Sequence, residues 1–100
     1  MINNVTLVGR LTRDPEFSQT GSGVSLVRFS VAVDRNYTNA QGERSTDFIN
    51  SVAWRGLAET ISNLAVKGSL VGLTGRIQTG SYQNNEGRTV YTTDVVVDNF

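Results

Sequence analysis

The chain of 100 residues contains neither cysteine nor histidine. Their absence excludes disulfides, thiolate and imidazole metal ligands, cysteine nucleophiles and any Ser-His-Asp triad. No apolar run approaches the roughly 18 to 20 residues of a membrane helix, and Met1 to Asn4 lack the charged start and apolar stretch of a signal peptide. We therefore expect a cytoplasmic protein without a cofactor, a metal site or a membrane partner.

Proline occurs once, and neither sign of charge predominates, since nine basic residues balance nine acidic ones. Hydrophobic residues make up 38% of the chain and charged residues 18%, which is a globular composition. The length predicts a single domain covering residues 1–100. Eight of the nine basic residues are arginine and only Lys67 is lysine. Arginine binds phosphate bidentately and stacks on flat rings, so this bias is a weak indication of a polyanionic partner.

Alternation of apolar and polar residues predicts five strands. In the second strand, Val27, Phe29, Val31 and Val33 share one face. The third strand combines a face of small or aliphatic residues, suited to the wall of a curved barrel, with a face that bears the large aromatics Phe48 and Trp54. The predicted strands cover residues 4–12, the stretch around 27–33, and residues 46–54, 69–79 and 88–97.

A helix is predicted from Gly56 to Val66, where the hydrophobic period changes. Lys67 and Gly68 would end it, with a cation in the last turn and a glycine for the left-handed cap. Its predicted buried face consists of Leu57, Ile61, Leu64 and Ala65.

Three strands, one helix and two further strands define the predicted fold. It is an all-β, five-stranded Greek-key OB-fold barrel with one α-helix between the third and fourth strands. Polar segments at residues 36–43 and 81–87 are long enough to form hairpin arms. Some apolar residues fall on the outward parity, which suggests that a second copy of the chain covers them. These residues are Val8, Leu26, Leu70 and Val96.

OB-folds bind oligonucleotides or oligosaccharides across their second and third strands. Aromatic rings on which bases stack, together with cations that follow the backbone, are typical of single-stranded nucleic acid binding. Phe48 and Trp54 could equally be core residues, whereas Tyr37 and Tyr82 lie in polar arms that offer little to pack against. We expect Phe29 and Tyr91 to be structural. The candidate binding residues are Tyr37, Phe48, Trp54, Tyr82, Arg10, Arg28, Arg35, Arg55 and Arg76.

Catalytic patterns are missing from the sequence. The acidic residues are scattered over turns and strand ends, and no pair has a spacing that dictates a shared site. The Gly21-Ser22-Gly23 loop is followed by neither a Lys-Ser/Thr pair nor a helix start, so it does not predict a phosphate-binding loop. We therefore expect no enzymatic activity.

Several ordered blocks resemble the bacterial single-stranded-DNA-binding protein family. The opening NNVTLVGRL at residues 3–11, followed by Asp14-Pro15-Glu16, is the first of them. Further blocks span nearly the whole chain in order. They are residues 39–43, residues 47–50 with Trp54, residues 67–69 with Gly75-Arg76, and residues 91–97.

The resemblance implies a homotetramer of OB-folds that binds and protects single-stranded DNA, without sequence preference, in replication, recombination and repair. It would be cytoplasmic and nucleoid-associated. The positions that match the family's base-stacking aromatics are Tyr37, Phe48, Trp54 and Tyr82. Ser18, Gly56 and Gly80 stand where relatives often have a basic residue, so weaker contacts to the DNA backbone are expected. The family's acidic C-terminal tail recruits replication and repair proteins, and such partners are expected only if a tail follows Phe100.

Two other classes of protein fit the same fold. One is a protein-interaction module of a primosome-like assembly, which would dock to replication enzymes and have negligible affinity for DNA. The other is a carbohydrate-binding OB domain, which the lack of cysteine and of a signal peptide disfavours. RNA binding is a variant of the main hypothesis, because stacking does not inspect the sugar closely.

Overall fold

The computed structural model describes residues 1–38, 40–42 and 44–100, with the backbone alone described at positions 37, 38 and 44. Six strands and one helix follow one another along the chain. They are β1 (Val5–Leu11), β2 (Glu16–Gln19), β3 (Ser25–Thr38), β4 (Arg44–Trp54), α1 (Arg55–Leu64), β5 (Leu70–Gln83) and β6 (Thr89–Asn99). All five predicted strands and the single helix are present, and β2 is an additional short strand.

The strands close into a ring. Their order in the sheet is β1-β5-β6-β4-β3-β2. A further antiparallel pairing, between β1 and β3, closes this row of strands into a ring. β4 and β6 form the parallel pair, with Ser51 beside Val95 and Val52 beside Val96. The predicted OB-fold is therefore confirmed, with β2 attached to the outer edge of β3.

Close approach of the backbones at the β1–β3 closure requires a glycine. A Cβ atom built on Gly9 would collide with the carbonyl oxygen of Ala32 and with a methyl group of Val31. Any larger residue would have to push β1 away from β3. Gly9 thus allows the ring to close.

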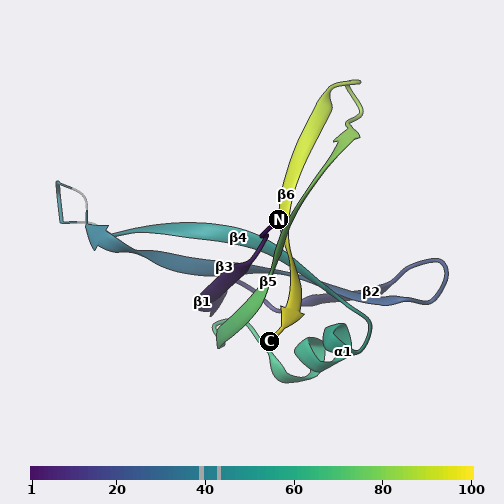
Figure 1. Cartoon of the computed structure of the whole chain (residues 1–100), viewed down its shortest axis with the longest axis horizontal. Helices are drawn as coiled ribbons and strands as arrows, with labels where there is room; N and C mark the ends of the chain where they lie inside the picture. The colour runs from purple at the N-terminus through teal and green to yellow at the C-terminus, as the bar shows by residue number, and fades with distance from the viewer. Residues whose placement is uncertain (39, 43) are drawn as a thin grey trace.

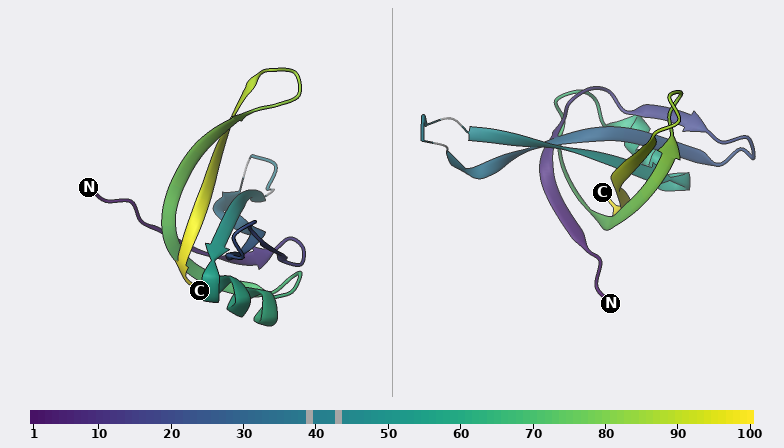
Figure 2. Two further views of the ribbon diagram at one scale, coloured as in Figure 1. Left: turned by 90° about the vertical axis from the view of Figure 1, so that its right-hand side faces the viewer. Right: turned by 90° about the horizontal axis from the view of Figure 1, so that it is seen from above.

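Two long hairpins extend beyond the ring (Figure 1). The β3–β4 arm and the β5–β6 arm leave it in different directions, and α1 lies at the end of the ring away from the β5–β6 arm (Figures 1 and 2). Both were predicted as hairpin arms, from the polar segments 36–43 and 81–87. In the structure β3 continues to Thr38 and β5 to Gln83, so each strand includes the start of its segment.

The core fills the ring and is covered at one end by α1. Val27, Val31, Ala53 and Ile61 are completely buried in it, and the ring of Phe100 packs edge-on against Phe29 with centroids 6.2 Å apart. Burial of Phe29 confirms its predicted structural role. The inward face of β4 is built from Ser51 and Ala53, small residues that leave room for the helix.

The helix differs from its prediction at both ends and on one face. It begins at Arg55 and ends at Leu64, where the amide of Ala65 donates to the carbonyl of Ile61 at 2.9 Å. Leu64, predicted to be buried, is exposed, and Ala58 occupies the core instead. Lys67 and Gly68 lie beyond the helix. Gly68 has the expected positive φ of 86°, but it serves the turn into β5, and its amide donates to the carbonyl of Leu11.

Candidate nucleic-acid interface

The outward face of β4 bears two exposed aromatic rings. Phe48 is 69% exposed and Trp54 is 40% exposed. Both have the parity opposite to the buried Ser51 and Ala53, because successive residues of a strand point to opposite faces. Neither ring is a core residue, so the alternative that the sequence left open is wrong for both. We call this outward face of β3 and β4 the β3–β4 surface.

Strand register places cations beside these rings. Arg28 lies opposite Val52 across β3 and β4, Val52 lies beside Val96 of β6, and Arg76 lies opposite Val96 across β5 and β6. An outward row therefore runs across four strands with an arginine at each end. Neither Arg28 nor Arg76 has a salt-bridge partner among the described residues.

Arg10 belongs to a second row of the same kind. It lies opposite Ala32, which in turn lies opposite Phe48. The guanidinium Nη1 of Arg10 donates to the carbonyl oxygen of Gly68 at 3.0 Å, which directs the side chain toward the loop before β5. One donor is thus occupied, and the others remain available.

Arg35 differs from the other predicted cations. Its Nη2 lies 2.9 Å from Oδ1 of Asp47, and its Nε donates to the same carboxylate. Asp47 precedes Phe48 and so faces the other side of the β3–β4 arm. The hydrogen bonds and charge of Arg35 lower the pKa of the Asp47 carboxyl below its ordinary value of 3.8. A phosphate at Arg35 would have to compete with this carboxylate.

Arg55 has an unusual backbone at the junction of β4 and α1. Its φ of 62° is the positive value of a non-glycine residue, found directly after Trp54. The left-handed conformation costs an ordinary residue about 1 to 2 kcal/mol. Strain of this kind concentrates at functional sites, and here it sets the direction in which the chain leaves Trp54.

The β5–β6 arm presents aromatics on both faces. Tyr82 pairs with Val90, and Tyr91 pairs with Ser81 on the neighbouring rung, so the two rings have opposite parity. Tyr82 is 57% exposed, as its predicted binding role requires. Tyr91 is 81% exposed, and the prediction that it is structural is wrong, because the arm extends past the core that would have covered it. Tyr37 belongs to β3, and its side chain lies outside the described part of the structure.

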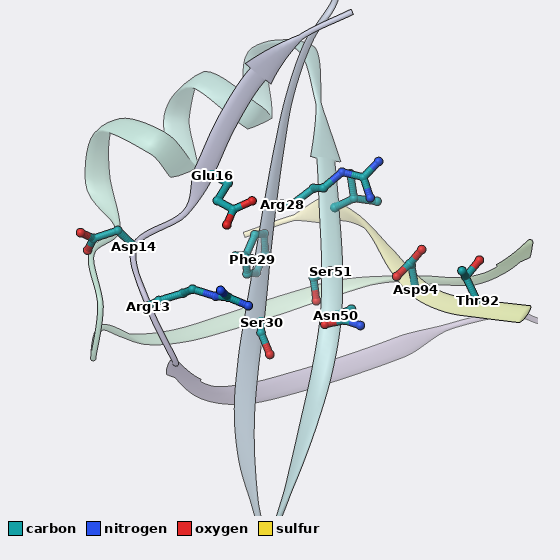
Figure 3. Close-up of a pocket in the computed structure, with 11 residues that line it drawn as sticks. Arg13, Asp14, Glu16, Arg28, Phe29, Ser30, Asn50, Ser51, Thr92 and Asp94 are labelled. Atoms are coloured by element: carbon teal, nitrogen blue, oxygen red, sulfur yellow. The ribbon is translucent and has the colours of Figure 1, made fainter. Parts of the chain in front are cut away.

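A hollow lies on the β3–β4 surface, between Phe48 and Trp54 along β4. Its volume is about 320 Å³, and it is lined by residues of β2, β3, β4 and β6 and of the loop between β1 and β2. In Figure 3, Arg13 and Glu16 stand on one side, Thr92 and Asp94 on the opposite side, and Ser30 and Asn50 between them. Arg13 was not predicted as a site residue, because its place in a loop gave no strand parity.

The loop that holds Arg13 is fixed at both ends. The amide of Thr12 donates to the carbonyl of Ser30 at 3.1 Å, and Oδ1 of Asp14 accepts from the amide of Lys67 at 2.8 Å. Asp14 also lines the hollow, and Oδ1 of its carboxylate is engaged by the amide of Lys67. Arg13 is held between two anchored neighbours.

The outward face of β1 and β5 is different in composition, and it adjoins Arg10, which lies opposite Leu70. Val8 of β1 lies opposite Gly72 of β5, Leu70 follows on the same face, and Val8 and Leu70 are each 62% exposed. We call this face the β1–β5 surface. Leu26 and Val96 were also predicted to need a second copy of the chain to cover them, and this is wrong. They are buried with Val52 in a small cluster of their own.

Within the described residues, no group of three or more acidic side chains is arranged to hold a metal ion. The same part of the chain has no helix that is long and apolar enough to cross a membrane.

Exposed rings and unpaired arginines on the outer face of an OB-fold define the class of nucleic-acid-binding OB proteins. The chain belongs to the Single-strand binding protein family, whose profile it matches over residues 2–100. Over its full length it is 56% identical to the single-stranded DNA-binding protein of Enterococcus faecalis and covers 53% of that protein. It is 54% identical to single-stranded DNA-binding protein 3 of Streptococcus agalactiae and covers 72% of it. The corresponding protein of Streptococcus pneumoniae is 56% identical, with 64% covered. The chain thus spans between half and three quarters of these relatives.

Proposed function

We propose that the chain binds single-stranded DNA by stacking bases on Phe48, Trp54 and Tyr82 while arginines neutralise phosphates. The observation on which this depends is the exposure of Phe48 and Trp54 together on the outward face of β4. Exposed aromatic surface costs free energy in water, and base stacking recovers it. The relatives' name, single-stranded DNA-binding protein, supports the same ligand.

The order of the cations supports the second half of the proposal. Arg28 and Arg76 flank the valine pair of β4 and β6, and β3 alone separates Arg10 from Phe48. Cations beside stacking rings let a protein follow a strand without inspecting its sequence. The activity is binding and protection within one domain, residues 1–100, without catalysis, in the cytoplasm at the nucleoid during replication, recombination and repair.

Fluorescence of Trp54, the single tryptophan, tests the proposal directly. A thymine oligonucleotide should quench it strongly, and the quenching should weaken with added salt, since phosphate contacts release counterions. Duplex DNA of the same length is the control and should have little effect. Absence of quenching and of a shifted gel band with either nucleic acid would favour the protein-docking alternative.

Self-association is the second part of the proposal. Val8 and Leu70 form an exposed aliphatic pair on the β1–β5 surface, and a second copy of the chain is the partner that would cover them. We propose a homotetramer in which this surface is one contact. Light scattering coupled to size exclusion gives the mass directly. A monomeric mass at micromolar concentration would contradict the assembly without affecting the DNA-binding proposal.

A further inference from the structure

The hollow on the β3–β4 surface lies where a bound strand would pass between two stacking rings. Phe48 and Trp54 are six residues apart on β4, which corresponds to about 20 Å at 3.3 to 3.4 Å per residue. Asn50 and Val52, between them on the same face, line the hollow. At the 3.4 Å rise of stacked DNA this distance corresponds to about six nucleotides, and to fewer in an extended strand. At least one nucleotide therefore crosses the hollow without a ring beneath it.

The charges around the hollow do not suit a phosphate. Arg13 and Arg28 offer only hydrogen-bond donors, while Glu16 and Asp94 offer only acceptors. The side chains of these four residues have no ion-pair or hydrogen-bond partner among the described residues. A phosphate would be attracted to the arginines but would stand beside two carboxylates. A neutral group that both donates and accepts would satisfy both kinds of side chain.

The register explains why both kinds of charge meet here. Glu16 lies directly opposite Arg28 across β2 and β3. Asn50 and Asp94 each come one residue before the parallel pair of Ser51 and Val95, and both line the hollow. Arg13 approaches from its anchored loop at Ser30. Donors and acceptors thus come from different elements and face one another across the hollow in Figure 3.

Among the four bases, guanine matches this arrangement best. Its O6 and N7 form a paired acceptor edge that arginine binds bidentately. Its N1–H and N2–H₂ groups form a paired donor edge that a carboxylate can accept bidentately. Adenine has no O6, and the pyrimidines have no N7 and no second donor. We propose that the hollow is a guanine-preferring base site, in which Arg13 binds the O6/N7 edge and Asp94 accepts from the N1/N2 edge. This inference rests on the proposed binding of single-stranded DNA.

A preference at one position is compatible with binding that is otherwise independent of sequence. The stacking contacts at Phe48, Trp54 and Tyr82 accept any base, because every base has a π face. A single hydrogen-bonding site then adds a modest amount of binding free energy for strands that place guanine over Asn50. The protein would bind every strand, and the binding positions that place guanine in the hollow would be the most populated.

The test compares short thymine oligonucleotides that differ in one central base. Competition against a labelled all-thymine strand should show about five- to tenfold tighter binding with a central guanine than with a central adenine, which is also a purine. Hypoxanthine, which lacks the N2 amino group, and 7-deazaguanine, which lacks N7, should each lose most of this gain. Equal affinity for guanine and adenine, with normal binding of the all-thymine strand, would overturn the inference alone. Failure to bind any strand would instead contradict the proposed function.

Matched variants identify the groups responsible. Asp94→Asn and Arg13→Gln should each reduce the ratio of guanine to adenine affinities to near one while the all-thymine strand still binds. Glu86→Gln and Arg88→Gln make the same charge changes near the tip of the β5–β6 arm and should keep the ratio of the unaltered chain. A ratio unchanged by Asp94→Asn and Arg13→Gln, or lost equally in the two controls, would contradict a base site in the hollow.

Discussion

The β3–β4 and β1–β5 surfaces are two outward faces of the same ring of strands, and they differ in chemistry. The first presents Phe48 and Trp54 with unpaired arginines beside them, and the second presents Val8 and Leu70. Aromatic rings combined with cations suit a flexible polyanion, whereas aliphatic side chains on a flat sheet suit another protein surface. The proposed nucleic-acid surface and the proposed self-contact therefore lie on different strands of the ring.

Removing both aromatic rings from the β3–β4 surface is the most direct test of the difference between the two surfaces. The double variant Phe48→Ala, Trp54→Ala should lose about 2 to 6 kcal/mol of binding free energy, since each lost stack costs about 1 to 3 kcal/mol. Polarisation of a labelled thymine oligonucleotide measures the loss. The mass of the assembly should not change. An unchanged affinity would remove both rings from the interface.

A charge on the β1–β5 surface should have the converse effect. Val8→Asp would bury a carboxylate against the second copy, and we expect the dissociation constant of the assembly to rise at least tenfold. Sedimentation over a range of concentrations measures it. Gln83→Asp adds the same charge at the arm and is the control. If Val8→Asp leaves the assembly intact, the self-contact lies elsewhere.

The salt dependence of DNA binding tests whether an individual arginine contacts a phosphate. Arg76→Gln should reduce the slope of log affinity against log salt by about 0.7, the value for one phosphate of a single strand. Lys67→Gln, in the loop before β5, should leave the slope as it is. Titrations at several salt concentrations give both slopes. Equal slopes in all three proteins would indicate that Arg76 touches no phosphate.

A substitution of Arg55, the strained residue after Trp54, should change the stability of the fold and the affinity for DNA in opposite directions. Arg55→Gly removes the penalty of the positive φ, and we expect up to about 1 kcal/mol of added stability. The same change deletes a cation, so affinity for DNA should fall slightly. Thermal unfolding and DNA titration measure the two effects. A lower melting temperature would show that the side chain of Arg55 contributes more than its backbone costs.

The smallest expected effect concerns the reverse side of the β3–β4 arm. Because the Asp47 pKa is lowered in the folded chain, its contribution to stability is present above the ordinary value of 3.8 and is lost as the pH falls through the lower folded pKa. An NMR titration of the Asp47 carboxyl should show this value. In Arg35→Gln the pKa should return toward 3.8. No difference between the two proteins would contradict the assigned ion pair.

The sequence was sufficient to predict the features that depend on the alternation of apolar and polar residues. Both faces of β4 and the existence of one helix followed from hydrophobic periods, and so did the outward aromatics. β2 was missed because Glu16–Gln19 is exposed throughout and has no alternating pattern to detect. Its pairing with β3 is a tertiary contact between backbones.

Errors in the predicted surface had a different cause. Parity correctly pointed Leu26 and Val96 outward, but it could not show that β3, β4 and β6 bring them together with Val52. Tyr91 has the parity of a core residue and is exposed because its arm has left the ring. Arg13 depends on a loop fixed by Asp14 and the amide of Lys67, residues far apart in the sequence. The burial of Leu26 and Val96, the exposure of Tyr91 and the position of Arg13 all depend on contacts between residues that are distant in the sequence.

The closure of the ring also has a consequence for how the chain folds. β1 pairs with β5 across more than half of the chain, and the parallel pair of β4 and β6 joins residues separated by nearly half of it. Contacts between such distant residues require large loops to close before any of their energy is gained, and domains dominated by them fold in milliseconds to seconds. The β3–β4 and β5–β6 hairpins are local and can form early. Gly9 and the short β4–β6 pairing then join them, so the proposed nucleic-acid surface is complete only when the ring closes.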